Sequence, residues 1–125
     1  MEQARGELKA ARDLYATSNH AWCCFACQQA AEKALKAILE HYGSPTPGHN
    51  LLALASEASK FTKIPRKIES ACRRLNRHYI PTRYPNAFPS GAPIHMFNEE
   101  DAREALKDAE EVVNFAGRVT GTAKV

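Results

Sequence analysis

Arginine, histidine and tyrosine side chains gather in two adjoining stretches in the second half of the chain. The first stretch, residues 73–79, reads RRLNRHY, and the second, residues 81–86, reads PTRYPN. A guanidinium group can hold a phosphate through two parallel hydrogen bonds, and a histidine of ordinary pKa can accept or return a proton near pH 7. These residue types therefore predict a site for a phosphate-bearing ligand.

Arg83 and Tyr84 lie between Pro81 and Pro85, which stiffen the short segment that carries them. A pre-ordered guanidinium beside an aromatic ring suits a phosphate group with a stacked base. The alternative is structural, with Arg83 capping carbonyl groups at a helix end and Tyr84 filling the core. The sequence gives these two interpretations equal weight.

Positive charge is unevenly distributed along the chain. The formal net charge is only +3, but residues 60–83 hold eight Lys and Arg side chains against one acid, so this segment carries +7 and the remainder −4. Such an asymmetry indicates an anionic partner, nucleic acid or nucleotide, at one face. A solvated helix face that only keeps the protein in solution would produce the same pattern.

The helix predicted over residues 19–42 is the element around which the other segments must pack. Its strongly polar side chains recur at three- and four-residue steps, and they are Gln29, Glu32, Lys33, Lys36 and Glu40. Its alanines at 26, 30, 34 and 37 form a thin face where another backbone can approach. Its bulky face, for a second neighbour, holds Trp22, Phe25, Leu35 and Leu39.

Four more helices are predicted around this central one. They cover residues 3–17, a shorter segment starting near Asn50, a segment opening at Pro65, and a segment from a cap at Asn98 to Gly117. A turn at residues 17–19, which includes the cap residue Asn19, makes the first two helices antiparallel. We expect residues 80–97, with four prolines, to lie against the bundle as an ordered loop, and residues 118–125 to fray.

The predicted fold class is therefore all-α, in one domain of 125 residues. It is an up-and-down bundle of four long helices plus one short helix, with a long proline-rich loop before the last helix. No membrane span and no apolar leader are evident, so we expect a cytoplasmic protein. The four cysteines are interpreted as thiols, because no second C-x-x-C or H-x3-H pair accompanies Cys24 and Cys27, and no metal or other cofactor is expected.

Four segments, in this order, resemble the HEPN domain. They are WCCFACQQAAEKALK at 22–36, GHNL at 48–51, YIPTRYP at 79–85 and EDAREAL at 100–106, and the likeness covers roughly residues 5–117. The resemblance implies a small helical bundle that is usually dimeric and that is named for nucleotide binding. Many HEPN proteins are metal-independent ribonucleases that use an arginine, four to six intervening residues and a histidine. Some are toxins paired with a minimal nucleotidyltransferase as antitoxin.

Arg73 and His78, with four residues between them, match that spacing and are the candidate catalytic pair. A histidine can take the proton of a ribose 2′-hydroxyl while an arginine holds the scissile phosphate, without a metal. On an unbroken helix the two lie about 140° apart, so either the helix ends between them or a dimer completes the site. The side chains assigned to nucleotide or phosphate binding are Arg74, Arg77, Tyr79, Arg83 and Tyr84.

Two functions remain open at this point, and a third option is a purely structural dimer. In the first, a homodimer with a nucleotidyltransferase partner acts as a toxin-like ribonuclease on RNA bound at a basic surface. In the second, the residues are chemically inert and the protein is a nucleotide-binding or protein-interaction module that partners a nucleotidyltransferase. His78 would then be a histidine at the end of a helix that interacts favourably with the helix dipole. For His49 and His95, capping or solvent exposure is favoured over catalysis.

Overall fold

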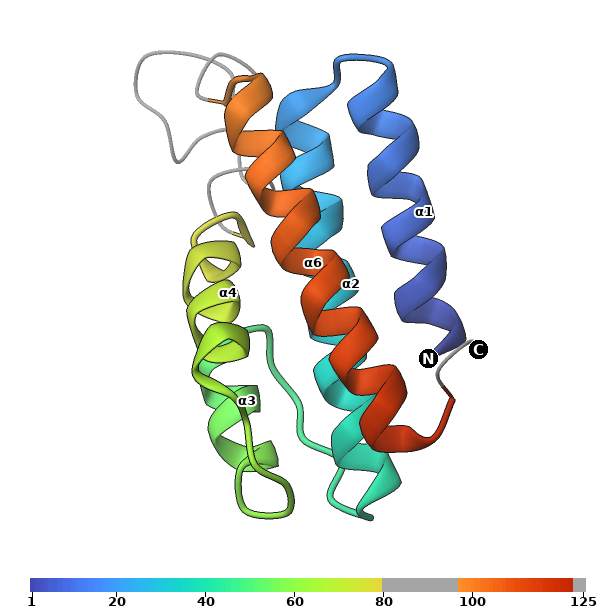
Figure 1. Ribbon diagram of the computed structural model, residues 1–125, viewed down its shortest axis with the longest axis vertical. Helices are drawn as coiled ribbons and strands as arrows, with labels where there is room; N and C mark the ends of the chain where they lie inside the picture. The colour runs from blue at the N-terminus through green and yellow to red at the C-terminus, as the bar shows by residue number, and fades with distance from the viewer. Residues whose placement is uncertain (80–96, 123–125) are drawn as a thin grey trace.

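Helix α2 is surrounded by the other helices of the bundle. The computed structural model describes residues 1–79 and 97–122. In these ranges α1 spans Glu2–Ala16, α2 His20–His41, α3 Leu51–Ala58, α4 Arg66–Asn76 and α6 Glu99–Thr120. Figure 1 shows α6 in front of α2, with α1 on one side and α3 and α4 on the other. The predicted all-α fold is confirmed, and the described residues contain no strand.

The core lies along α2, which packs against α1, α3, α4 and α6. Ala26, Ala30 and Ala34 are buried, as predicted for the face where neighbouring backbones approach closely. Leu35 and Leu39 are fully buried, but Trp22 is exposed and meets the edge of Phe25. The prediction that Trp22 belongs to a packed face is therefore wrong. No helix in the described ranges is long and apolar enough to cross a bilayer.

The helix caps follow the sequence signals with one exception. Asn50 Oδ1 accepts hydrogen bonds from the backbone N–H groups of Leu52, at 3.0 Å, and Ala53, at 3.2 Å. Asn98 forms a capping box with Asp101. Asn19 stands at the cap position of α2, but its amide group donates to Thr17 Oγ1 at 2.8 Å and its side chain makes no cap hydrogen bond. The prediction of a side-chain cap at Asn19 is wrong.

These two asparagines allow a matched test. We expect Asn50→Ala to lower the free energy of unfolding by about 1 kcal/mol, because two amide groups at the start of α3 lose their acceptor. Asn19→Ala removes only an exposed side-chain contact and should change it by less than about 0.5 kcal/mol. Urea denaturation of both variants measures the difference. Equal losses would contradict the assigned cap.

Helix α6 continues beyond Gly117, the predicted end. It runs to Thr120 and ends at Gly121, whose φ of 73° lies in the left-handed region that glycine adopts without strain. The Thr122 N–H donates to the Gly117 carbonyl at 2.9 Å and closes the last turn. The prediction that the chain frays from residue 118 is therefore wrong for 118–120, and residues 123–125 lie outside the described residues.

Candidate functional site

Helix α4 ends at Asn76, between the two predicted catalytic residues Arg73 and His78. This ending is one of the two arrangements that the spacing allowed. Arg73 lies on the exposed side of α4, pairs with Glu69 at 3.3 Å and lines a groove against α3. His78 is only 4% exposed, and its ring meets that of Phe97 edge-on at 5.5 Å between centroids. Within one chain, the two side chains therefore lie in different surroundings.

The environment of His78 favours the neutral imidazole. Burial lowers its pKa to about 4, and the neighbouring positive charge of Arg77 acts in the same direction. His78 is therefore uncharged near pH 7. A neutral imidazole can accept a proton, and it lacks the positive charge that would interact with the dipole at the end of α4.

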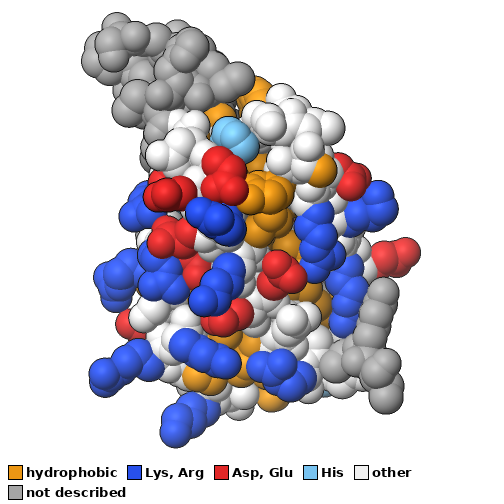
Figure 2. Space-filling view, turned by 45° about the horizontal axis from the view of Figure 1, so that its top comes forward, with side chains coloured by type: hydrophobic (Ala, Val, Ile, Leu, Met, Phe, Trp, Pro, Cys, Tyr) orange, Lys and Arg blue, Asp and Glu red, His pale blue; other side chains and the backbone are white. Residues whose placement is uncertain are grey.

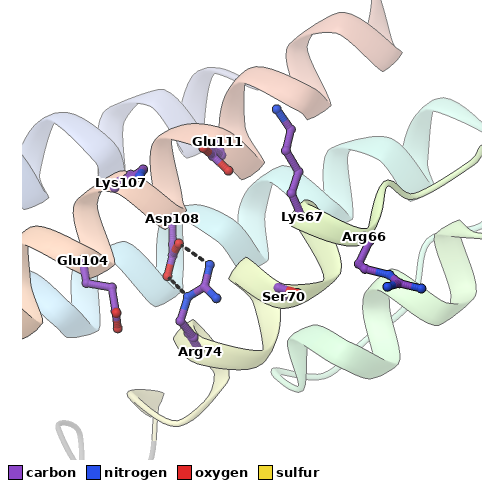
Figure 3. A pocket seen from close by; sticks show the side chains of 8 residues that line it. All are labelled: Arg66, Lys67, Ser70, Arg74, Glu104, Lys107, Asp108 and Glu111. Carbon is purple, nitrogen blue, oxygen red and sulfur yellow. Dashed lines mark hydrogen bonds and ion pairs between the residues drawn. The ribbon is translucent and has the colours of Figure 1, made fainter.

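A groove of about 670 Å³ is lined by side chains of α4 and α6. Its lining mixes both signs of charge: Arg66, Lys67, Ser70, Arg74, Glu104, Lys107, Asp108 and Glu111. Figure 3 shows the Arg74 guanidinium directed at the Asp108 carboxylate, with Nε to Oδ2 at 2.8 Å and Nη2 to Oδ1 at 2.9 Å. Arg66 points away from this pair. Among the described residues, Arg66, Lys67 and Lys107 have no ion-pair partner, so they are the cations at this groove that remain available.

Most arginines in α4 and directly after it already have carboxylate partners in the same chain. Arg77 pairs with Glu104 at 3.1 Å, in addition to the pairs of Arg73 with Glu69 and Arg74 with Asp108. Figure 2 accordingly shows Lys and Arg side chains interspersed with Asp and Glu. The excess charge of residues 60–83 is thus not an uninterrupted basic surface. Arg83, Tyr84 and His95 fall outside the described residues, so their predicted roles stay predictions.

Glu32, which the sequence pattern placed on the polar face of α2, is a buried carboxylate. The side chain of Glu32 is 3% exposed. His49 Nδ1 lies 2.9 Å from Oε1, and Lys36 Nζ lies 3.1 Å from Oε2. Burial alone would raise the pKa of Glu32, but the hydrogen bonds from His49 and Lys36 outweigh it and the pKa lies below its usual value. Glu32 is therefore ionised near pH 7.

The contacts around Glu32 and His49 join three parts of the chain, namely α2, the loop before α3 and the residue Tyr79 after α4. Gln28 Nε2 donates to the His49 carbonyl at 3.1 Å, which fixes the loop before α3 against α2. The His49 ring stacks on that of Tyr79, with 4.6 Å between centroids and 13° between planes. The ring centroid of Tyr79 also lies 6.3 Å from the ring centroid of Phe25 in α2. The prediction of solvent exposure for His49 is confirmed, since its side chain is 49% exposed. The cap of α3 is Asn50, and His49 also pairs with Glu32, which the sequence did not indicate.

A sequence signal for this network exists, since Gln28, Glu32 and Lys36 follow one another at four-residue steps. The same spacing is typical of a solvated helix face. What distinguishes a buried network from a solvated helix face is the burial of Glu32 against His49, which is 17 residues away in the sequence. The four cysteines provide no metal-binding set here. All are buried and free, and no cluster of metal-ligating side chains occurs in residues 1–79 and 97–122.

Comparisons with known proteins agree on one family. The sequence matches the HEPN domain over residues 1–119. A Methanocaldococcus jannaschii protein described as a "putative toxin" is 30% identical over 126 residues, which cover 90% of this chain and 80% of that protein. TT1696 from Thermus thermophilus is 36% identical with a TM-score of 0.90, covering 94% of this chain and 93% of that one. ST0689, described as an archaeal HEPN homologue, is 32% identical with a TM-score of 0.78 and the same coverage. The chain belongs to the HEPN domain family.

Proposed function

We propose that this HEPN protein is a toxin-type, metal-independent ribonuclease, and that Arg73 and His78 form its catalytic pair across a homodimer. The observation that carries the proposal is a neutral imidazole just past the end of α4, five residues after an exposed arginine. The archaeal relative described as a toxin supports the same assignment. Because one chain holds the two side chains in different surroundings, the proposal requires Arg73 of one protomer to reach His78 of its partner.

The chemistry fits these two side chains. A neutral His78 accepts the proton of a ribose 2′-hydroxyl, and the resulting 2′-oxygen bonds to the adjacent phosphorus. The bond from phosphorus to the 5′-oxygen breaks, and that oxygen takes a proton from water, so a 2′,3′-cyclic phosphate and a free 5′-hydroxyl are formed. Arg73 stabilises the charge that develops on the phosphoryl oxygens. Arg66, Lys67 and Lys107 at the α4/α6 groove are available for RNA phosphates, and Arg83 and Tyr84 are proposed to bind phosphate and a base. A minimal nucleotidyltransferase is the proposed antitoxin partner.

RNA cleavage by the purified chain in excess chelator tests this function. We expect cleavage by the unchanged protein and a fall of about 100-fold for Arg73→Ala, which loses the group that holds the phosphate. Arg73 is exposed, so this variant should fold normally. Arg12→Ala is the matched control, because Arg12 is an exposed arginine of α1 in an ion pair with Glu110. Equal cleavage by all three proteins would indicate a contaminant and contradict the proposal.

A second function is favoured by the burial of His78 and by the ion pairs of Arg74 and Arg77. These features suit a nucleotide-binding or protein-interaction module that partners a nucleotidyltransferase without cleaving RNA. Titration with ATP distinguishes it, since the exposed Trp22 reports binding by fluorescence. Binding without cleavage, weakened by Arg83→Ala, would support this module. An unchanged response in Arg83→Ala would remove Arg83 from the site.

A further inference from the structure

Three ring contacts form a continuous series from helix α2 to the loop before α3. The ring centroids of Trp22 and Phe25 lie 6.2 Å apart, and those of Phe25 and Tyr79 lie 6.3 Å apart. Tyr79 then stacks on His49 at 4.6 Å. We call these four side chains the aromatic strip. Because Tyr79 directly follows His78 in the sequence, the strip adjoins the proposed catalytic base.

Trp22 is the large apolar side chain of the aromatic strip that solvent reaches most. It is 48% exposed, more than Tyr42 at 37% and Phe61 at 40%. The ring planes of Trp22 and Phe25 lie at 83°, so Phe25 covers at most one face of the indole. Tyr42 and Phe61, by contrast, stack on each other with 10° between their planes. An indole face in contact with water is a surface on which a nucleobase can stack.

A lysine lies on the same stripe of α2 as Trp22. At 100° per residue, Trp22, Phe25 and Lys33 fall within about 80° of one another around the helix, and Trp22 and Lys33 are about 16 Å apart along its axis. Lys36 is bound to Glu32 at 3.1 Å, whereas no carboxylate in the described ranges pairs with Lys33. Aromatic rings in line with a cation are the combination by which proteins bind single-stranded nucleic acids.

We infer that the exposed stripe of α2 binds a single RNA strand, with a base stacked on Trp22 and a phosphate held by Lys33. The inference rests on the proposed ribonuclease function and deepens it, because it names single-stranded RNA as the substrate class. Bases in a duplex are paired and stacked on their neighbours, so they offer the indole no face. Since the aromatic strip leads to Tyr79, a strand that lies along it passes the candidate site.

Quenching of tryptophan fluorescence measures this binding directly, because Trp22 is the one tryptophan of the chain. The probe is an unstructured 2′-O-methyl RNA oligonucleotide, which lacks the 2′-hydroxyl that cleavage needs and is therefore bound without being cut. We expect strong quenching by this strand and little by the same strand annealed to its complement. Lys33→Gln should reduce the slope of log K against log salt by about 0.7, which corresponds to one phosphate contact. The matched control Lys60→Gln, at an exposed lysine after α3, should keep the slope.

Variants at position 22 separate base stacking from a role in folding. Trp22 is exposed, so Trp22→Ala should fold normally. Its affinity for a labelled strand, measured by fluorescence anisotropy, should fall about tenfold. Trp22→Tyr keeps an aromatic ring and should recover most of that affinity. The matched control is Phe61→Ala, which removes an exposed aromatic ring outside the aromatic strip and should bind like the unchanged protein.

Equal affinities of Trp22→Ala and Phe61→Ala, equal binding of strand and duplex, or an unchanged salt slope in Lys33→Gln would each overturn the inference. So would a Trp22→Ala protein with half the mass of the unchanged protein in sedimentation equilibrium, because Trp22 would then be a contact between copies of this chain. None of these measurements depends on cleavage. Binding of the strand without cleavage of ordinary RNA would contradict the ribonuclease function alone.

Discussion

Lowering the pH from 7.5 to 4 should reduce the free energy of unfolding by about 3 kcal/mol through His78 alone. Burial lowers the pKa of this histidine to about 4 in the folded protein, whereas an unfolded histidine titrates near 6.5. The unfolded chain therefore binds a proton that the folded chain resists. The stabilisation is fully present above about pH 6.5 and is lost as the pH falls towards 4.

Urea denaturation at several pH values between 7.5 and 4 measures this effect. His78→Leu replaces the imidazole with an apolar side chain that does not titrate, so most of the slope between pH 6.5 and 4 should vanish. The control His41→Leu should keep the slope, because His41 is exposed. Glu32, whose pKa lies below its usual value, affects only the region below about pH 4.3, where an unfolded glutamate takes up its proton. A slope that persists in His78→Leu would assign the acid sensitivity to other groups.

The helices were predictable because their apolar spacing is determined locally. The buried alanines of α2, such as Ala30 and Ala34, follow the helical period, and so do the buried residues of α3 and α4. Proline and asparagine at helix starts gave the boundaries to within about two residues. The length of α6 was underestimated because Gly117, a residue that often ends helices, is here buried inside one.

The candidate site depends on contacts between residues far apart in the sequence, which no local sequence pattern predicts. Glu32 looks like any glutamate on a wet helix face until His49, from a distant loop, covers it. Burial of His78 likewise depends on where Phe97 packs. The sequence gives the net charge of residues 60–83 correctly. Whether that charge forms a basic surface depends on α6, which supplies the opposing carboxylates Asp108 and Glu104. Tertiary pairing, rather than composition, decides which cations remain available.

Arg73 and Arg74 illustrate this point, because they are adjacent in sequence but should differ greatly in their contribution to stability. Arg73 and its partner Glu69 are 65% and 57% exposed, so Arg73→Ala should cost less than about 0.5 kcal/mol. Arg74 is 41% exposed, but Asp108 is only 5% exposed and receives two hydrogen bonds from it. Arg74→Ala leaves a buried carboxylate without its partner, and we expect a loss of about 3 kcal/mol.

A pair of double-mutant cycles tests whether the pairing itself causes the difference. For Arg74 and Asp108, each single alanine variant should be strongly destabilised, and the double variant should lose much less than the sum because no unpaired charge remains buried. The cycle for Arg73 and Glu69 should be additive within about 0.5 kcal/mol. Additive losses in the first cycle would mean that Arg74 stabilises α4 by some other contact. A large coupling makes Arg74 a structural member of the α4/α6 groove, which leaves anion binding there to Arg66, Lys67 and Lys107.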